Sequence, residues 1–498
     1  MVLGIDLGTT YSAAAYMDEN GEVQVITNSE GSRLTPSVFF EDTENSIVIG
    51  EIAKENAYMR PQDVVRAIKN DMGKKITKKT SSGKEYTPEE ISSYIIRKMV
   101  QDSEKYIGVD KITDVVITVP AYFSDAQRKA TEDAARIAGV NMIGSVNEPT
   151  AAILSYIQKK DLKGGKYMVY DLGGGTFDVS IVSLDEEIPK VIGLDGVRET
   201  GGHFFDEAIV KYVCDKLAEE HDIDLNDEQY RDELQDLYNK AEKCKIQLSS
   251  RKSASIMLKV ADVKETIEIT REQFEEMIRR LYRKTETKVK NAVREAGITM
   301  DELDAVLMVG GSSRIPYIEE KVAALTGKTP ARDINPDEAV ASGAAIYGYM
   351  NQTKPGTPVV VDACSHSIGF MYTKPDGTRE NIKLIKKNTN LPATYVQDVM
   401  IVEDNQARID LMITEGEGVL EGQVDIVETV KIKLPEGLRR NDPYTITYSL
   451  DKYQMLHINV KIPITPPWNY EHKFDRKSNL SEGEVIKLTG IALANTVS

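Results

Sequence analysis

The chain has 498 residues, of which 41% are hydrophobic and 28% charged, proportions typical of ordinary globular proteins. Its net charge of −17 argues against nucleic-acid binding, because phosphate backbones attract clustered Lys and Arg. The three cysteines are scattered without a CxxC motif, which argues against a disulfide framework or a zinc site and favours a reducing compartment. No early apolar run has the length of a signal peptide or a membrane span, so we expect a cytoplasmic protein that does not act at a membrane.

The first 350 residues predict strands that alternate with helices. Apolar runs predict strands within residues 1–40 and at Asp114–Val119. Capping boxes at Ser124–Gln127 and Thr270–Gln273 predict the starts of two helices, and a long helical stretch is expected from Gly201 to about Leu248. Alternation of this kind predicts an α/β architecture.

A change of pattern near residue 354 predicts a second domain. Lys354–Pro358 has the composition of a domain boundary, and the apolar run Val359–Val361 that follows it is either a first β-strand or a segment that docks reversibly. From residue 363 to 479 the pattern is one of short alternating strands with turns, which predicts an all-β domain. Only residues 480–498 are helix-like.

Two similar hairpins stand out in the first part. Val169–Ser180 reads VYDLGGGTFDVS and Leu3–Ser12 reads LGIDLGTTYS, so each has a strand, an Asp and a glycine turn. Exposed N–H groups in such turns can hold a phosphate. We expect the glycines of the Val169–Ser180 hairpin to adopt φ values that are closed to other residues. Asp6 and Asp171, at the strand ends, are placed to hold a hydrated Mg²⁺. Either hairpin alone is explained as well by a tight turn with a capping Asp, but the pair suggests an internal duplication that faces one nucleotide from two sides.

The motifs together resemble the superfamily of ATPases that includes actin, hexokinase and the heat shock chaperones. The sequences Val119–Phe123 (VPAYF), Asn147–Ala152 (NEPTAA), Gly310–Pro316 (GGSSRIP) and the Val359–Asp362 linker narrow the resemblance to DnaK-like chaperones of the heat shock protein 70 family. The resemblance covers nearly all of the chain. It implies an α/β fold with a two-lobed, actin-like ATPase built on duplicated ribonuclease-H-like cores with inserted subdomains, followed by an all-β peptide-binding sandwich.

The domains implied by the resemblance are an ATPase domain at 1–353, a linker at 354–362, a substrate-binding sandwich at 363–479 and a short helical remnant of a lid at 480–498. The implied activity is that of an ATP-dependent chaperone. It would bind extended apolar segments of unfolded proteins, hydrolyse ATP, and act in protein folding and the stress response.

The resemblance also implies a set of site residues. The catalytic set is Lys69, Glu148, Asp6, Asp171 and Thr176, with Asp6 and Asp171 holding Mg²⁺ through water. ATP or ADP would be bound by residues of both hairpins, of the second-lobe loops and of the adenosine side, namely Gly8, Thr9, Thr10, Tyr11, Gly173, Gly174, Gly175, Gly201, Gly202, Glu242, Lys245, Ser249, Gly310, Gly311, Ser312, Arg314 and Asp337. From the residues alone, without the resemblance, a solvated surface lysine is the preferred interpretation of Lys69, and Glu148 is explained by a helix N-terminal acid.

The chain departs from the family pattern at the start of the second lobe. Val197 stands where a catalytic Asp is expected and Phe204 where a cation ligand is expected, while Asp195 lies two residues before Val197 and could substitute for it. These changes predict slow ATP hydrolysis. His203 is either a new ligand or an exposed loop residue.

Partner residues follow from the same resemblance. A J-domain protein and a nucleotide exchange factor are candidate partners, although Gly144 replaces an Arg of the family's J-protein contact. Arg128, Pro120 and Asp362 match positions that transmit the nucleotide state to the sandwich. The candidate residues for binding unfolded peptide are Phe370, Val399, Ile401, Ile409 and Leu411, each of which is almost equally expected as plain sandwich core.

Two other functions fit parts of the sequence. An ATP-gated holdase or co-chaperone with little hydrolysis would explain Val197 and Phe204. A sugar or metabolite kinase of the same superfamily would leave the Val359–Asp362 segment and the β domain unexplained, so it ranks last.

Overall fold

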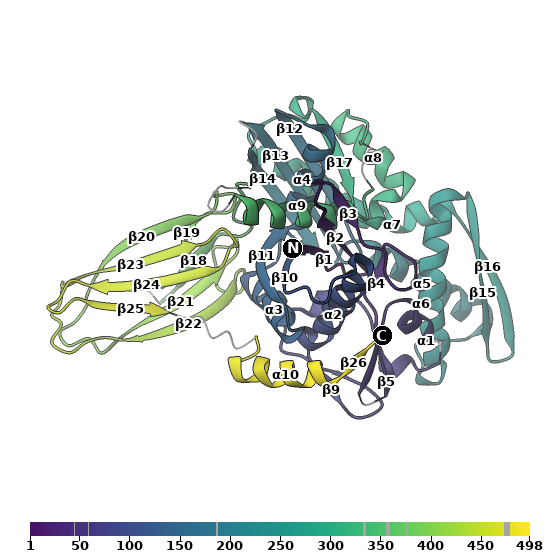
Figure 1. Cartoon of the computed structure of the whole chain (residues 1–498), viewed down its shortest axis with the longest axis horizontal. Helices are drawn as coiled ribbons and strands as arrows, with labels where there is room; N and C mark the ends of the chain where they lie inside the picture. Colours follow the sequence, from purple (N-terminus) through teal and green to yellow (C-terminus); the bar gives the residue numbers. More distant parts are fainter. Residues whose placement is uncertain are drawn as a thin grey trace.

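The computed structural model describes residues 1–43, 45–57, 59–185, 188–331, 335–354, 359–374, 377–472 and 479–498. Figure 1 shows a two-lobed α/β body with an elongated β-sandwich projecting from one side. Most of the predicted domain boundary, at 355–358, lies outside the described residues.

Lobe I is built on the sheet β11-β10-β1-β2-β3, with β4 pairing to β2. The Leu3–Ser12 hairpin forms its centre, because β1 pairs antiparallel with β2 and parallel with β10. The strands of this sheet are β1 (Val2–Asp6), β2 (Tyr11–Met17), β3 (Val23–Val25), β4 (Thr35–Pro36), β10 (Asp114–Val119) and β11 (Asn141–Asn147).

Lobe II repeats this arrangement in the sheet β14-β13-β12-β17. Here β12 pairs antiparallel with β13 and parallel with β17, as β1 does with β2 and β10. The predicted duplication is therefore present in the strand topology. The strands are β12 (Gly165–Leu172), β13 (Thr176–Asp185), β14 (Ile188–Arg198) and β17 (Ala305–Val309).

Helices α4 (Glu148–Lys160) and α9 (Ala339–Thr353) pack on each other and join the two lobes. The contact is close because Gly343 lies against the backbone of Ala151, where a Cβ would overlap the carbonyl oxygen. Gly4 of β1 approaches the backbone of α9 in the same way. The two sheets thus share one helical layer, and their hairpins face the same cleft.

The remaining helices cover the lobes. The capping boxes of α3 and α7 are formed as predicted, by Ser124 with Gln127 and by Thr270 with Gln273. The long helical stretch expected from Gly201 to Leu248 is instead two helices, because the chain turns at Asp222 with a φ of 57°. These helices are α1 (Glu51–Asn56), α2 (Pro88–Ile107), α3 (Asp125–Ile137), α5 (Gly202–His221), α6 (Arg231–Ser250), α7 (Arg271–Glu295) and α8 (Pro316–Thr326).

Three small sheets complete the two lobes. One lies in lobe I in the order β26-β6-β5-β7, another pairs β8 with β9, and the third pairs β15 with β16. Their strands are β5 (Phe39–Thr43), β6 (Ser46–Ile49), β7 (Val64–Val65), β8 (Lys78–Lys79), β9 (Glu85–Tyr86), β15 (Ser253–Val260), β16 (Val263–Thr270) and β26 (Thr496–Val497).

The all-β domain is a sandwich of two four-stranded sheets, β19-β18-β21-β22 and β20-β23-β24-β25. Its core is filled by alternating inward side chains such as Ile413, Ile432 and Ile458. The strands are β18 (Ile368–Thr373), β19 (Arg379–Ile385), β20 (Ala393–Met400), β21 (Arg408–Glu415), β22 (Asp425–Lys433), β23 (Pro443–Leu450), β24 (Leu456–Ile462) and β25 (Trp468–His472).

The segment that links the lobes to the sandwich is docked on lobe II. Val361 exchanges backbone hydrogen bonds with the β14 edge, since Val191 N donates to Val361 O at 2.9 Å and Val361 N donates to Pro189 O at 2.9 Å. Val359 is buried in the core shared by the lobes. The apolar run therefore acts as a short strand added to the lobe II sheet.

The expected terminal helix is present as α10 (Glu482–Ala494), but it lies on lobe I. It packs against α3 and α2 (Figure 1), and β26 after it pairs parallel with β6. The contacts of α10 that the described residues show are with lobe I, and its assignment as the remnant of a lid stays a prediction.

The α4–α9 contact gives a test of the fold. We expect Gly343→Ala to lower the free energy of unfolding by about 2 kcal/mol or more, because helix backbones in close contact cannot admit a methyl group. Gly490→Ala in α10 is the matched control, since a Cβ there meets no atom within 4 Å, and it should raise stability by about 0.5–1 kcal/mol. Chemical denaturation measures both, and equal stabilities would contradict the packing described.

Candidate nucleotide site

Four carboxyl groups and one lysine meet where the two hairpins face each other. Asp6 ends β1 and Asp171 lies near the end of β12, so the matched ends of two equivalent strands bring them to one cleft. Glu148 opens α4 between the lobes, and Lys69 reaches it from lobe I to form an ion pair. Lys69 is only 5% exposed, so the alternative of a solvated surface lysine is wrong.

The fourth carboxyl group, Asp178, was not predicted. It lies on β13 directly opposite Asp171 and accepts a hydrogen bond from Tyr122 N at 3.1 Å. The seven-residue spacing of Asp171 and Asp178 about a glycine turn could have revealed this, because an antiparallel hairpin places such residues side by side.

The cluster carries more negative charge than one lysine can balance. Burial, and then the charge of Glu148, raises the pKa of both Asp6 and Asp178 to about 7. The same two causes raise the pKa of Asp171 well above its usual range. Oxygen ligands with surplus negative charge are what Mg²⁺ requires, and a bound divalent cation would lower these pKa values again. The carboxyl groups therefore fit a magnesium site.

The glycine turns bring the loops into close contact. A Cβ on Gly174 would overlap Thr10 Oγ1, and one on Gly175 would overlap Asn70 Oδ1. Neither of these glycines, nor Gly173, has positive φ, so the expectation of φ values closed to other residues is wrong. Glycine is needed here for close approach between lobes. Gly201 does have a φ of 151° and lies against Gly173 O.

A cavity of about 360 Å³ extends from this cluster across the cleft. It is lined by all but two of the predicted catalytic and nucleotide-binding residues, Gly175 and Gly201 being the exceptions. Ser312 Oγ fixes the adenosine-side loop by donating to Gly173 O at 2.8 Å. Arg314 is held by Asp337, with Nη2 to Oδ2 at 2.6 Å, at the exposed rim. The volume and the lining suit a nucleoside triphosphate.

An ion pair joins the two lobes across the cleft. Lys54 Nζ of α1 lies 2.7 Å from Glu242 Oε2 of α6, and it also donates to Tyr11 OH at 3.1 Å. Burial alone would raise the pKa of Glu242, but Lys54 holds that pKa below its usual range. Lys54 was not predicted, because nothing in its local sequence shows that it faces the other lobe. We call the Lys54–Glu242 pair the clamp.

The substituted positions at the start of the second lobe do not line the cavity. Val197 pairs with Phe177 on β13 and packs on the lobe II core. Asp195 cannot replace a catalytic carboxylate in this structure, because its Oδ1 lies 3.1 Å from Lys288 Nζ and 3.3 Å from Lys387 Nζ, and its Oδ2 accepts from Asn291 Nδ2 at 3.0 Å. Neither these residues nor Phe204 lines the cavity. His203 stacks on Tyr238 and contacts Glu207 at 3.2 Å, so it is a partly exposed residue of the cleft wall.

The candidate peptide-binding residues occupy the sandwich. Ile401, Ile409 and Leu411 are buried in its core, while Phe370 and Val399 are half-buried against it. The sandwich also has exposed apolar side chains. Tyr395, Val396, Met400 and Val402 lie on β20 and the turn after it, and others lie on β18, on β22 and in the segment before β22.

A family model described as Hsp70 protein matches residues 2–433. The chain belongs to the Hsp70 family. Members of the Hsp70 family are chaperones and ATPases that bind ATP or ADP with Mg²⁺, which agrees with the carboxyl cluster and the cavity. The Hsp70 match includes both lobes and most of the sandwich, and no helix among the described residues is long and apolar enough to cross a membrane.

The raised carboxyl pKa values predict a pH dependence of stability. Asp178, with a pKa near 7, holds a proton in the folded state that the unfolded chain has already released, so the nucleotide-free protein loses stability as pH rises from about 4 to about 7. We expect Asp178→Asn to lose less stability than the wild type between about pH 5 and pH 7, by about 1 kcal/mol. Thermal unfolding at a series of pH values measures this. The exposed Asp262→Asn is the control and should follow the wild type, and parallel curves for all three proteins would contradict the assignment.

Proposed function

We propose that this Hsp70 protein couples ATP hydrolysis in the cleft to the binding and release of extended apolar peptide segments by the sandwich. The observation that carries the proposal is a short chain of contacts from the carboxyl cluster to the linker. Arg128 Nη2 donates to Asn147 Oδ1 at 2.8 Å, and Asn147 Nδ2 donates to Asp362 Oδ2 at 2.6 Å. Asn147 directly precedes Glu148, so movement of the catalytic carboxylate is transmitted to the linker.

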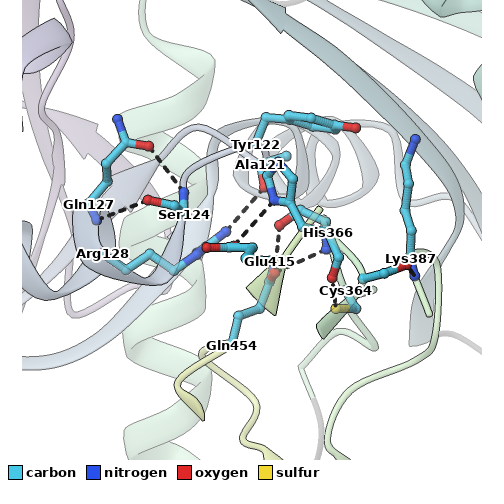
Figure 2. Close-up of polar contacts among 12 residues, drawn as sticks. Ala121, Tyr122, Ser124, Gln127, Arg128, Cys364, His366, Lys387, Glu415 and Gln454 are labelled. Atoms are coloured by element: carbon cyan, nitrogen blue, oxygen red, sulfur yellow. Dashed lines mark hydrogen bonds and ion pairs between the residues drawn. The ribbon is translucent and has the colours of Figure 1, made fainter. Parts of the chain in front are cut away.

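A second route runs through Tyr122. Its backbone N–H donates to Asp178, and its ring packs edge-on against His366 of the sandwich with centroids 4.3 Å apart. Figure 2 shows Arg128 and Tyr122 of lobe I beside His366 and Glu415 of the sandwich. His366 is neutral at physiological pH, because burial lowers its pKa to about 3. This contact therefore depends on packing and is sensitive to small displacements.

The sandwich also contacts lobe II. Lys387 lies 3.3 Å from Asp195 and 3.2 Å from Glu295, and Asn388 Nδ2 donates to Glu295 at 2.6 Å. Asn388 Oδ1 accepts from Leu194 N at 3.1 Å. Contacts with both lobes would be disturbed by any rotation of one lobe against the other, which supports control of the sandwich by the nucleotide.

In the hydrolysis we propose, positioning and electrostatics do most of the work. Asp6 and Asp171 would hold Mg²⁺ through water, and the bound ion would neutralise charge on the phosphates. Lys69 is fixed by Glu148 and offers its remaining N–H donors to the γ-phosphate and the attacking water. Thr118 Oγ1 holds Asp6 by donating to Oδ1 at 3.0 Å. The loops at Thr9, Thr10 and Gly173–Gly175 would bind the phosphates.

For the sandwich, we propose that the exposed apolar side chains of β20 bind peptide together with the half-buried Phe370 and Val399. β20 is an edge strand, and edge strands with exposed apolar residues are suited to extended peptides. Ile401, Ile409 and Leu411 would support this surface from the core. The partners are unfolded polypeptides and, as candidates, a nucleotide exchange factor and a J-domain protein.

The J-domain contact is not expected at Gly144. A Cβ at that position would lie 3.3 Å from Tyr453 Cε1 of the docked sandwich, and Tyr453 OH donates to Ile143 O at 3.1 Å. The place where the family has an Arg is therefore covered by a sandwich tyrosine. Slow hydrolysis and the holdase function, expected from Val197 and Phe204, stay predictions.

Single-turnover ATP cleavage tests the enzyme. We expect Lys69→Ala to be slower than the wild type by a factor of about 100 or more, because positioned charge supplies most of the rate. Lys321→Ala, at a position that does not line the cavity, is the control and should cleave at the wild-type rate. Equal rates for the wild type and Lys69→Ala would establish a holdase.

Release of a labelled apolar peptide from the ADP form on addition of ATP tests the coupling. We expect ATP to speed release about tenfold or more in the wild type and to have little effect in Asp362→Ala, which lacks the link to Asn147. Both proteins should bind the peptide equally in ADP. Release that is indifferent to ATP in the wild type would overturn the proposal.

A further inference from the structure

Residues 479–498 fill a groove on lobe I. Val485 and Ala492 are buried in the lobe I core, and Leu480, Leu488 and Val497 pack against that core. Because these apolar side chains complete the lobe I core, the segment is part of the lobe I structure, even though the whole sandwich separates it from the rest of lobe I in the sequence.

Polar contacts fix the end of α10 on helix α2. Arg97 donates to the carbonyl oxygens of Ala492 and Asn495 and so caps the helix. Asn495 Nδ2 donates to Tyr94 OH at 2.6 Å in the buried core. These contacts set the position at which the chain leaves the helix.

The next residues add a strand to the edge of β6. Thr496 N donates to Asn45 O at 3.0 Å, Ser498 N to Ile47 O at 3.1 Å, and Ile49 N to Ser498 O at 2.9 Å. Backbone hydrogen bonds along this edge thus engage both donors and acceptors of the β6 segment.

The strand so held leads directly to the clamp. β6 ends at Ile49, Gly50 turns the chain with a φ of 105°, and α1 begins at Glu51. Ala53 of α1 packs on Val48 of β6, and Lys54 follows with its side chain paired to Glu242 across the cleft. The position of β6 therefore sets the position of Lys54.

We propose that residues 495–498 act as a brace that holds the lobe I side of the Lys54–Glu242 clamp and thereby slows nucleotide release. Asn495 anchors the brace on α2 and the β26 pairing transfers its position to β6. Because residue 479 follows the sandwich in the chain, the brace also connects the C-terminal end of the sandwich to lobe I. The inference rests on the proposed binding of nucleotide in the cleft.

Dissociation of a fluorescent ADP analogue tests the brace in the full chain. The variant Thr496→Pro/Ser498→Pro loses the backbone hydrogen bonds that Thr496 and Ser498 donate, since proline has no N–H. We expect ADP to leave about ten times faster, with milder acceleration in Asn495→Ala, which keeps the strand donors. The control is Ile486→Ser on the exposed face of α10, where the side chain is 63% exposed and the rate should not change.

Combination with Lys54→Ala separates a brace from general stabilisation of lobe I. Lys54→Ala alone should also speed ADP release, and adding Asn495→Ala or the two prolines should give no further acceleration, because the brace acts through Lys54. If a combined variant releases ADP faster than Lys54→Ala alone, by the product of the two single effects, the proposal is overturned. It is also overturned if Asn495→Ala and the proline variant both release ADP at the wild-type rate. Failure of the wild type to bind the analogue would instead contradict the proposed function.

Discussion

The buried charge at the centre of the cleft is the constraint on which the other features depend. The cluster consists of one cation, Lys69, and four carboxyl groups, those of Asp6, Glu148, Asp171 and Asp178. Buried carboxylates lower the stability of a protein unless they are protonated or bound to a cation. The two hairpins, the α4 N-terminus and the Lys69 loop come from different parts of the chain. Only closure of the two lobes on each other holds them in place, so a ligand that neutralises the charge also stabilises the closed arrangement.

The connection to the sandwich begins at residues of this cluster. Glu148 is preceded by Asn147, whose side chain donates a hydrogen bond to Asp362 of the linker. Asp178 accepts a hydrogen bond from Tyr122, whose ring packs against His366. Both routes are short and pass through buried groups. Buried polar contacts have few alternative partners, so a change in charge at the cluster favours one arrangement of the interface over another.

Residues 479–498 complete lobe I. The lobes, the linker, the sandwich and residues 479–498 follow one another in sequence, and the last of these returns to the first lobe (Figure 1). The sandwich is therefore attached to the nucleotide-binding part at both of its ends. Its movement away from the lobes would be opposed by the docked Val361 at one end and by α10 and β26 at the other.

Local sequence determined the hairpins, the capped helices, the alternation of strands and helices, the linker and the all-β domain, because turns, caps and periodic burial depend on residues close in the chain. Motif resemblance added most of the cleft residues, since Lys69 and Glu148 have no local signature of their own. The tertiary structure alone decided that Asp195 faces Lys387 of the sandwich, that Lys54 pairs with Glu242, and that residues 495–498 pair with β6. These contacts join residues about 190 or more positions apart, and their partners are chosen by how the lobes and the sandwich pack, which no short pattern encodes.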